Sequence, residues 1–142
     1  MPSDDESHFV AVSVPPSGRI DIHSHLLPAL DDGCRDVEES FEEVRRLIAA
    51  GFVGSICTPH FLPFESDCPS VDHVLARVIA FSQQLRDAGL SYSVWPGGEL
   101  RLYDGLIPWL GSHGVPTLAG SRCVLVDFWE ARWPRWATEA FD

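Results

Sequence analysis

The alternation of strand-like and helix-like segments constrains the fold of this chain more than any other sequence feature. Short apolar runs rich in Val and Ile recur, and the stretches between them are long enough for one helix each. This rhythm is typical of parallel β/α units, in which a helix connects two parallel strands. The sequence therefore predicts an α/β protein with about four parallel strands, over residues 19–25, 52–58, 91–96 and 122–127.

Helices are expected over residues 36–50 and 71–88, near 104–112, and from Pro134 onward. Asp36 or Ser40 is expected to cap the first helix and Ser70 the second, because short polar side chains accept hydrogen bonds from free backbone N–H groups. Gly51 follows the first helix and Gly89 the second, as C-terminal glycines commonly do. The apolar spacing places the following residues on buried faces: Val37, Phe41, Val44, Leu47 and Ile48, then Val74, Leu75, Val78, Ile79 and Leu85.

The composition of the chain excludes some classes of binding partner. The 142 residues carry a formal net charge of −11, and all ten basic residues are arginine. An acidic chain without a basic patch is a poor binder of nucleic acid or of an anionic membrane surface. The N-terminus is acidic where a signal peptide is basic, and no apolar run approaches the roughly 20 residues of a membrane span, so we expect a cytoplasmic protein. Residues 1–18 are expected to be a flexible tail, and 19–142 one domain.

Side chains that bind metals stand at the end of each predicted strand. They are His23, His25, His60, Glu99 and Asp127. The carboxyl ends of parallel strands meet on one face of a β/α barrel, so residues distant in sequence can converge there. His23 and His25 are two positions apart on one strand, which puts them on the same side about 6.6 Å apart. Imidazoles and carboxylates at one point predict a divalent metal site.

Each of these residues also has a plain structural interpretation. Strand-end histidines are often polar residues without a ligand, and Glu99 after two glycines is compatible with a solvated loop acid. Asp127 ends an apolar run, so its carboxylate is either a metal ligand or buried and paired. Asp31 and Asp32 precede a glycine, a pattern that favours turn formation over metal binding.

Taken together, the motifs resemble the bacterial PHP-type tyrosine-protein phosphatases of capsular and exopolysaccharide systems, the CpsB/CapC family of the polymerase and histidinol phosphatase superfamily. The similarity runs in order from about Arg19 to Phe128. It is carried by Ile20-Asp21-Ile22-His23-Ser24-His25, Asp31-Asp32-Gly33, Thr58-Pro59-His60, Gly97-Gly98-Glu99-Leu100, Val115-Pro116-Thr117-Leu118 and Val124-Leu125-Val126-Asp127-Phe128.

The resemblance implies a PHP-type β/α barrel with two or more metal ions, usually manganese, with iron or zinc as alternatives. It implies hydrolysis of phosphotyrosine on a protein such as a bacterial tyrosine kinase. Within that pattern His23, His25 and His60 correspond to metal-binding histidines and Glu99 to a bridging glutamate. Asp127 stands where the family usually has glutamate.

The resemblance also implies further ligands, on a His-Pro-Glu-Arg-like strand end and a late Asp-x-His pair, that this sequence does not contain. We therefore expect the N-terminal part of a barrel, with weak or no activity alone. Open strand edges and the cluster of Trp129, Trp133 and Trp136 favour self-association. Two alternatives stay open: a PHP hydrolase of a small phosphoester, and a non-catalytic fragment that binds a metal or a partner.

Overall fold

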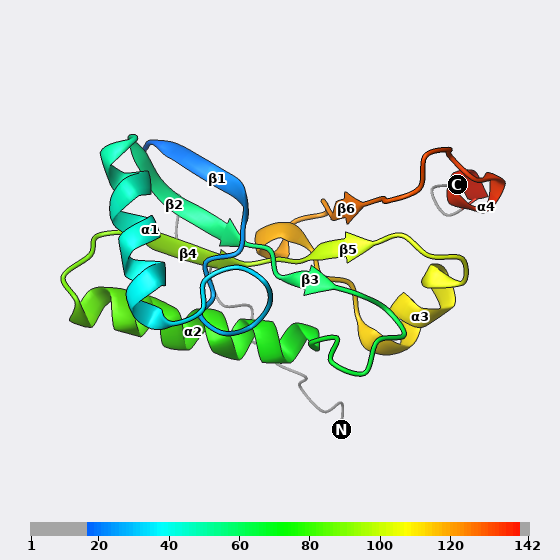
Figure 1. Cartoon of the computed structure of the whole chain (residues 1–142), viewed down its shortest axis with the longest axis horizontal. Helices are drawn as coiled ribbons and strands as arrows, with labels where there is room; N and C mark the ends of the chain where they lie inside the picture. Colours follow the sequence, from blue (N-terminus) through cyan, green and yellow to red (C-terminus); the bar gives the residue numbers. More distant parts are fainter. Residues whose placement is uncertain (1–16, 140–142) are drawn as a thin grey trace, which may run out of the picture.

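Two three-stranded sheets organise the chain in the computed structural model, which describes residues 17–139 (Figure 1). All strand pairings among these residues are parallel, so the predicted α/β class with parallel sheets is confirmed. The first sheet has the order β1-β2-β4, with β1 (Arg19–Ser24), β2 (Phe52–Cys57) and β4 (Ser93–Pro96). The second has the order β3-β5-β6, with β3 (His60–Phe61), β5 (Glu99–Arg101) and β6 (Leu125–Asp127).

The helices follow the predicted pattern of connections. They are α1 (Val37–Ala49), α2 (Val71–Asp87), α3 (Leu106–His113) and α4 (Arg135–Glu139), with a short 3₁₀ turn η1 (Leu118–Gly120). Asp36 caps α1 by accepting a hydrogen bond from the backbone N–H of Glu39, and Ser70 caps α2 through the N–H of His73. Gly51 and Gly89 both have positive φ just after these helices, as expected of residues that end a helix.

The expectation of one four-stranded arrangement differs from the structure. The chain leaves the first sheet after β2 and after β4, and each time it enters the second sheet a few residues later (Figure 1). Pro59 has no backbone N–H to continue the first ladder. At Gly98 a Cβ would lie 2.5 Å from Cδ2 of Phe61, so only glycine allows β5 to begin so close to β3. His60 and Glu99, expected after strands, therefore begin new ones.

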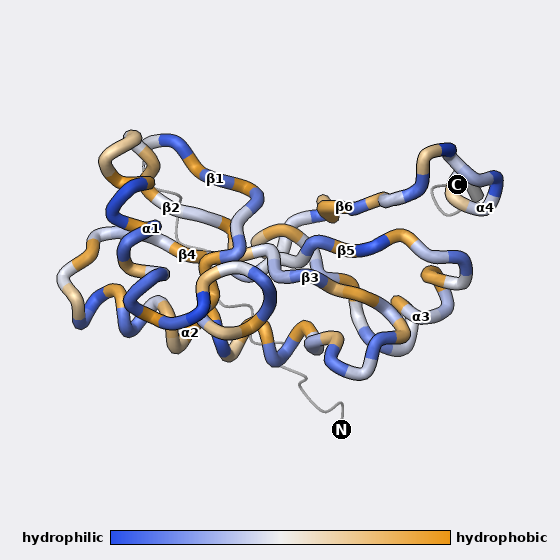
Figure 2. Tube along the Cα trace, viewed as in Figure 1, coloured by the Kyte–Doolittle hydropathy of each residue, from blue (hydrophilic) through white to orange (hydrophobic). Residues whose placement is uncertain are grey.

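Burial on the helices matches most of the predicted apolar faces. Along α2 apolar and polar stretches alternate, as a helix with one buried face requires (Figure 2). Val44 and Val74 are buried, but Ile48 is exposed and Ile79 is 57% exposed, which corrects two of the predicted core positions. Phe81, 1% exposed, takes the place on α2 that the sequence assigned to Ile79.

The ends of the chain are described only in part. The predicted tail lies outside the described residues apart from Ser17 and Gly18, and the predicted last helix is described over α4 alone. The strand predicted over 122–127 begins at Leu125, and Arg122 and Cys123 are exposed. Within residues 17–139, no helix is both long enough and apolar enough to cross a membrane.

Truncating Phe81 to alanine tests this account of the core. Its ring is buried and stacks on Phe41 at a centroid distance of 6.4 Å, so we expect Phe81→Ala to lower the free energy of unfolding by about 3–5 kcal/mol. Ile79→Ala on the same helix should change it by less than about 0.5 kcal/mol. Urea titration of both variants measures the difference. Equal losses would show that α2 packs through a different face.

Candidate metal centre

Four side chains from three strands meet where the two sheets join. Oε2 of Glu99 lies 3.2 Å from Nε2 of His23, 3.1 Å from Nε2 of His25 and 3.3 Å from Nδ1 of His60. The first two histidines come from the end of β1, and the other two residues from the starts of β3 and β5. The structure thus brings together four of the five residues that the sequence predicted as ligands.

The close contacts around Glu99 are not ordinary hydrogen bonds. Glu99 Oε2 and His60 Nδ1 are both buried, and neither has a hydrogen-bond partner among the described residues although they lie 3.3 Å apart. The distance fits an ion pair, but the orientation does not fit an N–H donor pointing at an oxygen. Hydrogen bonds weaken steeply when they are misaligned, so this contact is not one. Nitrogen and oxygen atoms that crowd together without bonding one another are the arrangement that a shared cation satisfies.

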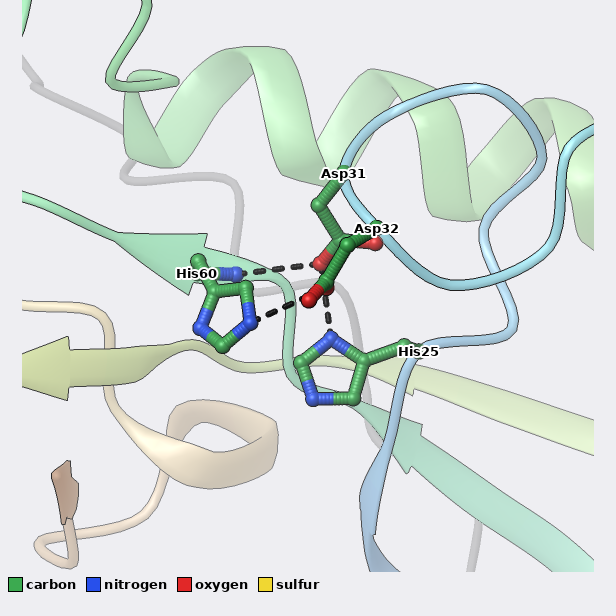
Figure 3. A group of neighbouring side chains, drawn as sticks. All are labelled: His25, Asp31, Asp32 and His60. Carbon is green, nitrogen blue, oxygen red and sulfur yellow. Dashed lines mark hydrogen bonds and ion pairs between the residues drawn. The ribbon is translucent and has the colours of Figure 1, made fainter.

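A second group of possible ligands adjoins the first. The loop after His25 folds back so that Nδ1 of His25 lies 2.7 Å from Oδ2 of Asp31, and Nε2 of His60 lies 3.0 Å from Oδ1 of Asp32 (Figure 3). His25, Asp31, Asp32 and His60 each offer one ligand atom within 4.8 Å of the others, as do His23, His25 and Glu99. The two groups share His25, whose two ring nitrogens face different carboxylates.

Sequence reasoning favoured a turn at Asp31 and Asp32, and the structure gives these residues a further role. Oδ1 of Asp31 accepts a hydrogen bond from the N–H of Gly33, which is a turn contact. Its Oδ2 accepts from the N–H of His60 and faces His25. A Cβ on Gly33 would lie 2.4 Å from Cβ of His25, so the glycine lets the loop pass directly over the histidine. The sequence signal that could have indicated this loop is Gly33 itself, eight residues after His25.

Asp31 and His25 shift each other's protonation. The contact with Asp31 raises the pKa of His25 above its usual 6.5, and this outweighs the opposing effect of burial. Burial alone raises the pKa of Asp31, but the contacts with His25 and with the N–H groups of Gly33 and His60 lower it below its usual 3.8. The carboxylate therefore stays charged at neutral pH and holds the Nδ1 side of the imidazole.

Backbone and hydroxyl contacts fix the strand ends that carry the histidines. Ser24 donates from Oγ to the carbonyl of Ile56, and its N–H donates to Oγ1 of Thr58. The N–H of Thr58 donates in turn to the carbonyl of Ser24. Asp21 accepts from the N–H of His23 at 3.1 Å. These bonds clamp the ends of β1 and β2 together, so the two histidines are presented by a fixed backbone.

Asp127 is not part of either group. It lies at the end of β6, where Arg101 is its register partner on β5, and its Oδ2 accepts a hydrogen bond from the indole Nε1–H of Trp129. Its role as a ligand therefore stays a prediction from the sequence. Among the described histidines, His73 and His113 are exposed and lie outside both groups, in agreement with their interpretation as surface residues.

A cavity of about 380 Å³ opens on the other side of His25, between the end of β1 and α1. Three carboxylates line it, and no arginine does. Its lining residues are Asp21, Ser24, His25, Leu26, Gly33, Cys34, Glu39, Glu43 and Leu47. This lining repels anions, so it does not suit a phosphoryl group.

Comparison with known proteins gives a consistent result. The family model described as "Capsular polysaccharide synthesis, CpsB/CapC" matches residues 19–137. The tyrosine-protein phosphatase YwqE of Bacillus subtilis (strain 168) is 29% identical over 124 residues, which cover 86% of this chain and 48% of the relative. The putative tyrosine-protein phosphatase CapC of Staphylococcus aureus is 24% identical over the same shares.

A solved structure is also similar. It comes from the work on YwqE of Bacillus subtilis and CpsB of Streptococcus pneumoniae, which describes them as unique metal-dependent tyrosine phosphatases. The TM-score is 0.79 at 29% identity, and the match covers 87% of this chain and 49% of the other. The chain thus spans about half the length of the relatives that it matches. Because the family model covers most of its residues, the chain belongs to the CpsB/CapC family of capsular polysaccharide synthesis.

Proposed function

We propose that this chain carries part of a metal-dependent phosphatase site that hydrolyses phosphotyrosine in proteins. The observation that carries the proposal is the convergence of three imidazole nitrogens within 3.3 Å of one Glu99 oxygen. Relatives named as tyrosine-protein phosphatases support the same chemistry. The family has no need of a cysteine nucleophile in this scheme, since a bound metal supplies the nucleophile.

The proposed ligands are His23, His25, His60, Glu99 and Asp127, to which the geometry adds Asp32. The donor set fits a divalent cation because the buried Glu99 oxygen and His60 nitrogen have no other partner among residues 17–139. Manganese is our proposed metal, with iron and zinc as alternatives, since mixed imidazole and carboxylate sites accept all three. Asp32 and Nε2 of His60 lie 3.0 Å apart beside the first group, and we propose that they help to hold a second ion in a complete site.

Asp31 is proposed to orient His25 and not to bind metal. Both of its oxygens are already engaged, one by the N–H of Gly33 and the other by His25 and the N–H of His60. Carboxylates that hold the outer nitrogen of a metal-binding histidine fix its tautomer and raise its basicity. Nε2 of His25 is then left to face Glu99.

When bound, the metal would lower the pKa of a coordinated water and neutralise charge on phosphoryl oxygens. The residues of this chain would hold the ions and fix their positions relative to the substrate. Clamped strand ends matter here, because small displacements of reacting groups cost large factors in rate.

Several wider features complete the proposal. The two sheets are proposed to be the first part of a PHP-type barrel within residues 19–142, and the substrate to be a phosphotyrosine protein such as a bacterial tyrosine kinase in the cytoplasm. Self-association is proposed through the edge strands β1 and β6 and through the exposed Trp129 and Trp133, which follow β6 in the chain. The alternatives are a PHP hydrolase of a small phosphoester and a non-catalytic fragment that binds a metal or a partner.

Metal content tests the ligand assignment. We expect the purified chain to retain less than one equivalent of Mn, Fe or Zn, and His23→Ala with His25→Ala to weaken Mn binding by about 10–100-fold or more, because even orienting partners of ligands contribute that much. His73→Ala removes an exposed imidazole and should change nothing. Elemental analysis and Mn titration give the answer, and equal metal in all three proteins would remove β1 from the site.

Metal binding should also depend on pH in a defined direction. The pKa of His25 is raised above 6.5, so at pH 6.5 most of this imidazole carries a proton that a metal must displace. Apparent Mn affinity should therefore rise as pH increases through the raised pKa. Asp31→Asn removes the main cause of the shift and should move the midpoint of metal uptake to lower pH. Competition titrations measure both midpoints, and an unchanged midpoint would contradict the role given to Asp31.

The activity of the 142-residue chain alone should be close to background. The relatives are about twice as long, and each missing electrostatic group typically costs about 10²–10³ in rate. A phosphotyrosine peptide assay with manganese, with and without an added C-terminal half of a homologous full-length protein, tests this. Turnover that appears on addition and disappears in His60→Ala would support the proposal. No turnover after addition would argue against a phosphatase.

A further inference from the structure

Arg101 is a half-buried cation that the proposed metal centre does not use. Its Nε and Nη1 atoms are buried and have no hydrogen-bond partner among residues 17–139. The indole ring of Trp129 covers the guanidinium, with Cζ 3.7 Å from the ring centroid, and the ring of Tyr103 lies 5.4 Å away. Burying a charged donor without an acceptor is unfavourable, so an unpaired guanidinium held in this way is suited to an anionic ligand.

The strand register places Arg101 on the same side of the second sheet as the metal centre. Glu99 and Arg101 are separated by one residue on β5, so their side chains leave the same face about 6.6 Å apart along the strand. Leu100 between them faces the opposite side and is buried in the core. The partner of Glu99 on β3 is His60. A group bound at the metal centre would therefore have Arg101 as its neighbour along the sheet.

The carboxylate opposite Arg101 in the strand register, that of Asp127, makes its hydrogen bond to another residue. Asp127 is paired with Arg101 across β5 and β6, yet its Oδ2 accepts from the indole N–H of Trp129. The indole is thus fixed at its nitrogen by Asp127 while its ring stacks on Arg101. This contact holds the plane of the guanidinium, as cation–π stacking does, and leaves Nε and Nη1 without an acceptor among residues 17–139.

We propose that Arg101, held by Trp129, is the anion subsite that binds the phosphoryl group of a phosphate monoester next to the metal centre. This inference rests on the proposed function. A planar guanidinium offers two parallel N–H donors that match two oxygens of a phosphoryl group. It also supplies local positive charge in a chain whose net charge of −11 repels phosphate. The cavity beside α1 is lined by three carboxylates and no arginine, so it is the less favourable place for phosphate.

The first test uses the unmodified chain without metal. In ¹⁵N-labelled, EDTA-treated protein, inorganic phosphate added at constant ionic strength should shift the side-chain Nε–H resonance of Arg101, which is identified by its loss in Arg101→Lys. Acetate serves as the carboxylate probe. A larger response to phosphate than to acetate supports a phosphoryl subsite. No response to phosphate, or a response to acetate alone, overturns the proposal.

The second test measures affinity with matched variants. Arg101→Gln should weaken phosphate binding by about tenfold or more, because hydrogen bonds to a charged group are lost. Arg101→Lys keeps the positive charge but loses the two parallel N–H donors of the guanidinium. Its phosphate affinity should therefore lie between those of Arg101→Gln and of the unmodified chain. Arg122→Gln removes the same charge from an exposed position and should change affinity less than about twofold. Equal losses in Arg101→Gln and Arg122→Gln would overturn the proposal.

Folding and catalysis do not confound these outcomes. Thermal melts establish that each variant is folded, and where Arg101→Gln is not, the resonance titration of the unmodified chain decides. Mn binding should be the same in Arg101→Gln as in the unmodified chain, which separates the anion subsite from the metal ligands. Phosphate binding is measured without metal, so its outcome is independent of the activity assay. Phosphate can fail to bind although the chain with an added C-terminal half hydrolyses phosphotyrosine, and it can bind although no hydrolysis occurs.

Discussion

The carboxylate of Glu99 is the point on which the rest of the site depends. Three imidazole nitrogens from two other strands approach a single oxygen of this side chain, and the oxygen accepts no well-aligned hydrogen bond from any of them. Lone pairs of neutral imidazoles and of a carboxylate repel one another at such distances. The cluster is therefore favourable only with added positive charge, from protons or from a cation. The pKa of His25 is raised chiefly by its hydrogen bond with Asp31, and the charge of Glu99 adds to the same effect.

The backbone forms this cluster where the first sheet gives way to the second. Cys57 pairs with Pro96 at the ends of β2 and β4, and His60 pairs with Glu99 at the starts of β3 and β5, so the same two segments stay side by side across the break. The new strands start after Pro59 and Gly98, at the place where β1 ends (Figure 1). Backbone close approach at Gly98 and Gly33 brings loops and strands nearer than any side chain would allow. The glycines thus act on the chemistry indirectly, by positioning the groups that carry it.

Local patterns in the sequence predict the helices and the parallel strands well, because caps and apolar spacing act over a few residues. Asp36 and Ser70 cap helices as expected, whereas Phe81 and not Ile79 continues the buried stripe of α2, three residues after Val78 and four before Leu85. Four predicted ligands converge, and Asp127 does not join them. The involvement of Asp31 and Asp32 depends on their contacts with His60, which lies 29 residues after Asp31, and such a long-range contact has no periodic signature in the sequence.

The location of bound manganese tests the central claim most directly. We expect crystals of the chain grown with Mn²⁺ to give an anomalous difference peak at bonding distance from Nε2 of His23, Nε2 of His25 and the Glu99 carboxylate, with a second peak near His60 and Asp32. A peak held only by carboxylates away from these histidines would contradict the account. So would crystals with no peak at the junction of the two sheets in saturating manganese.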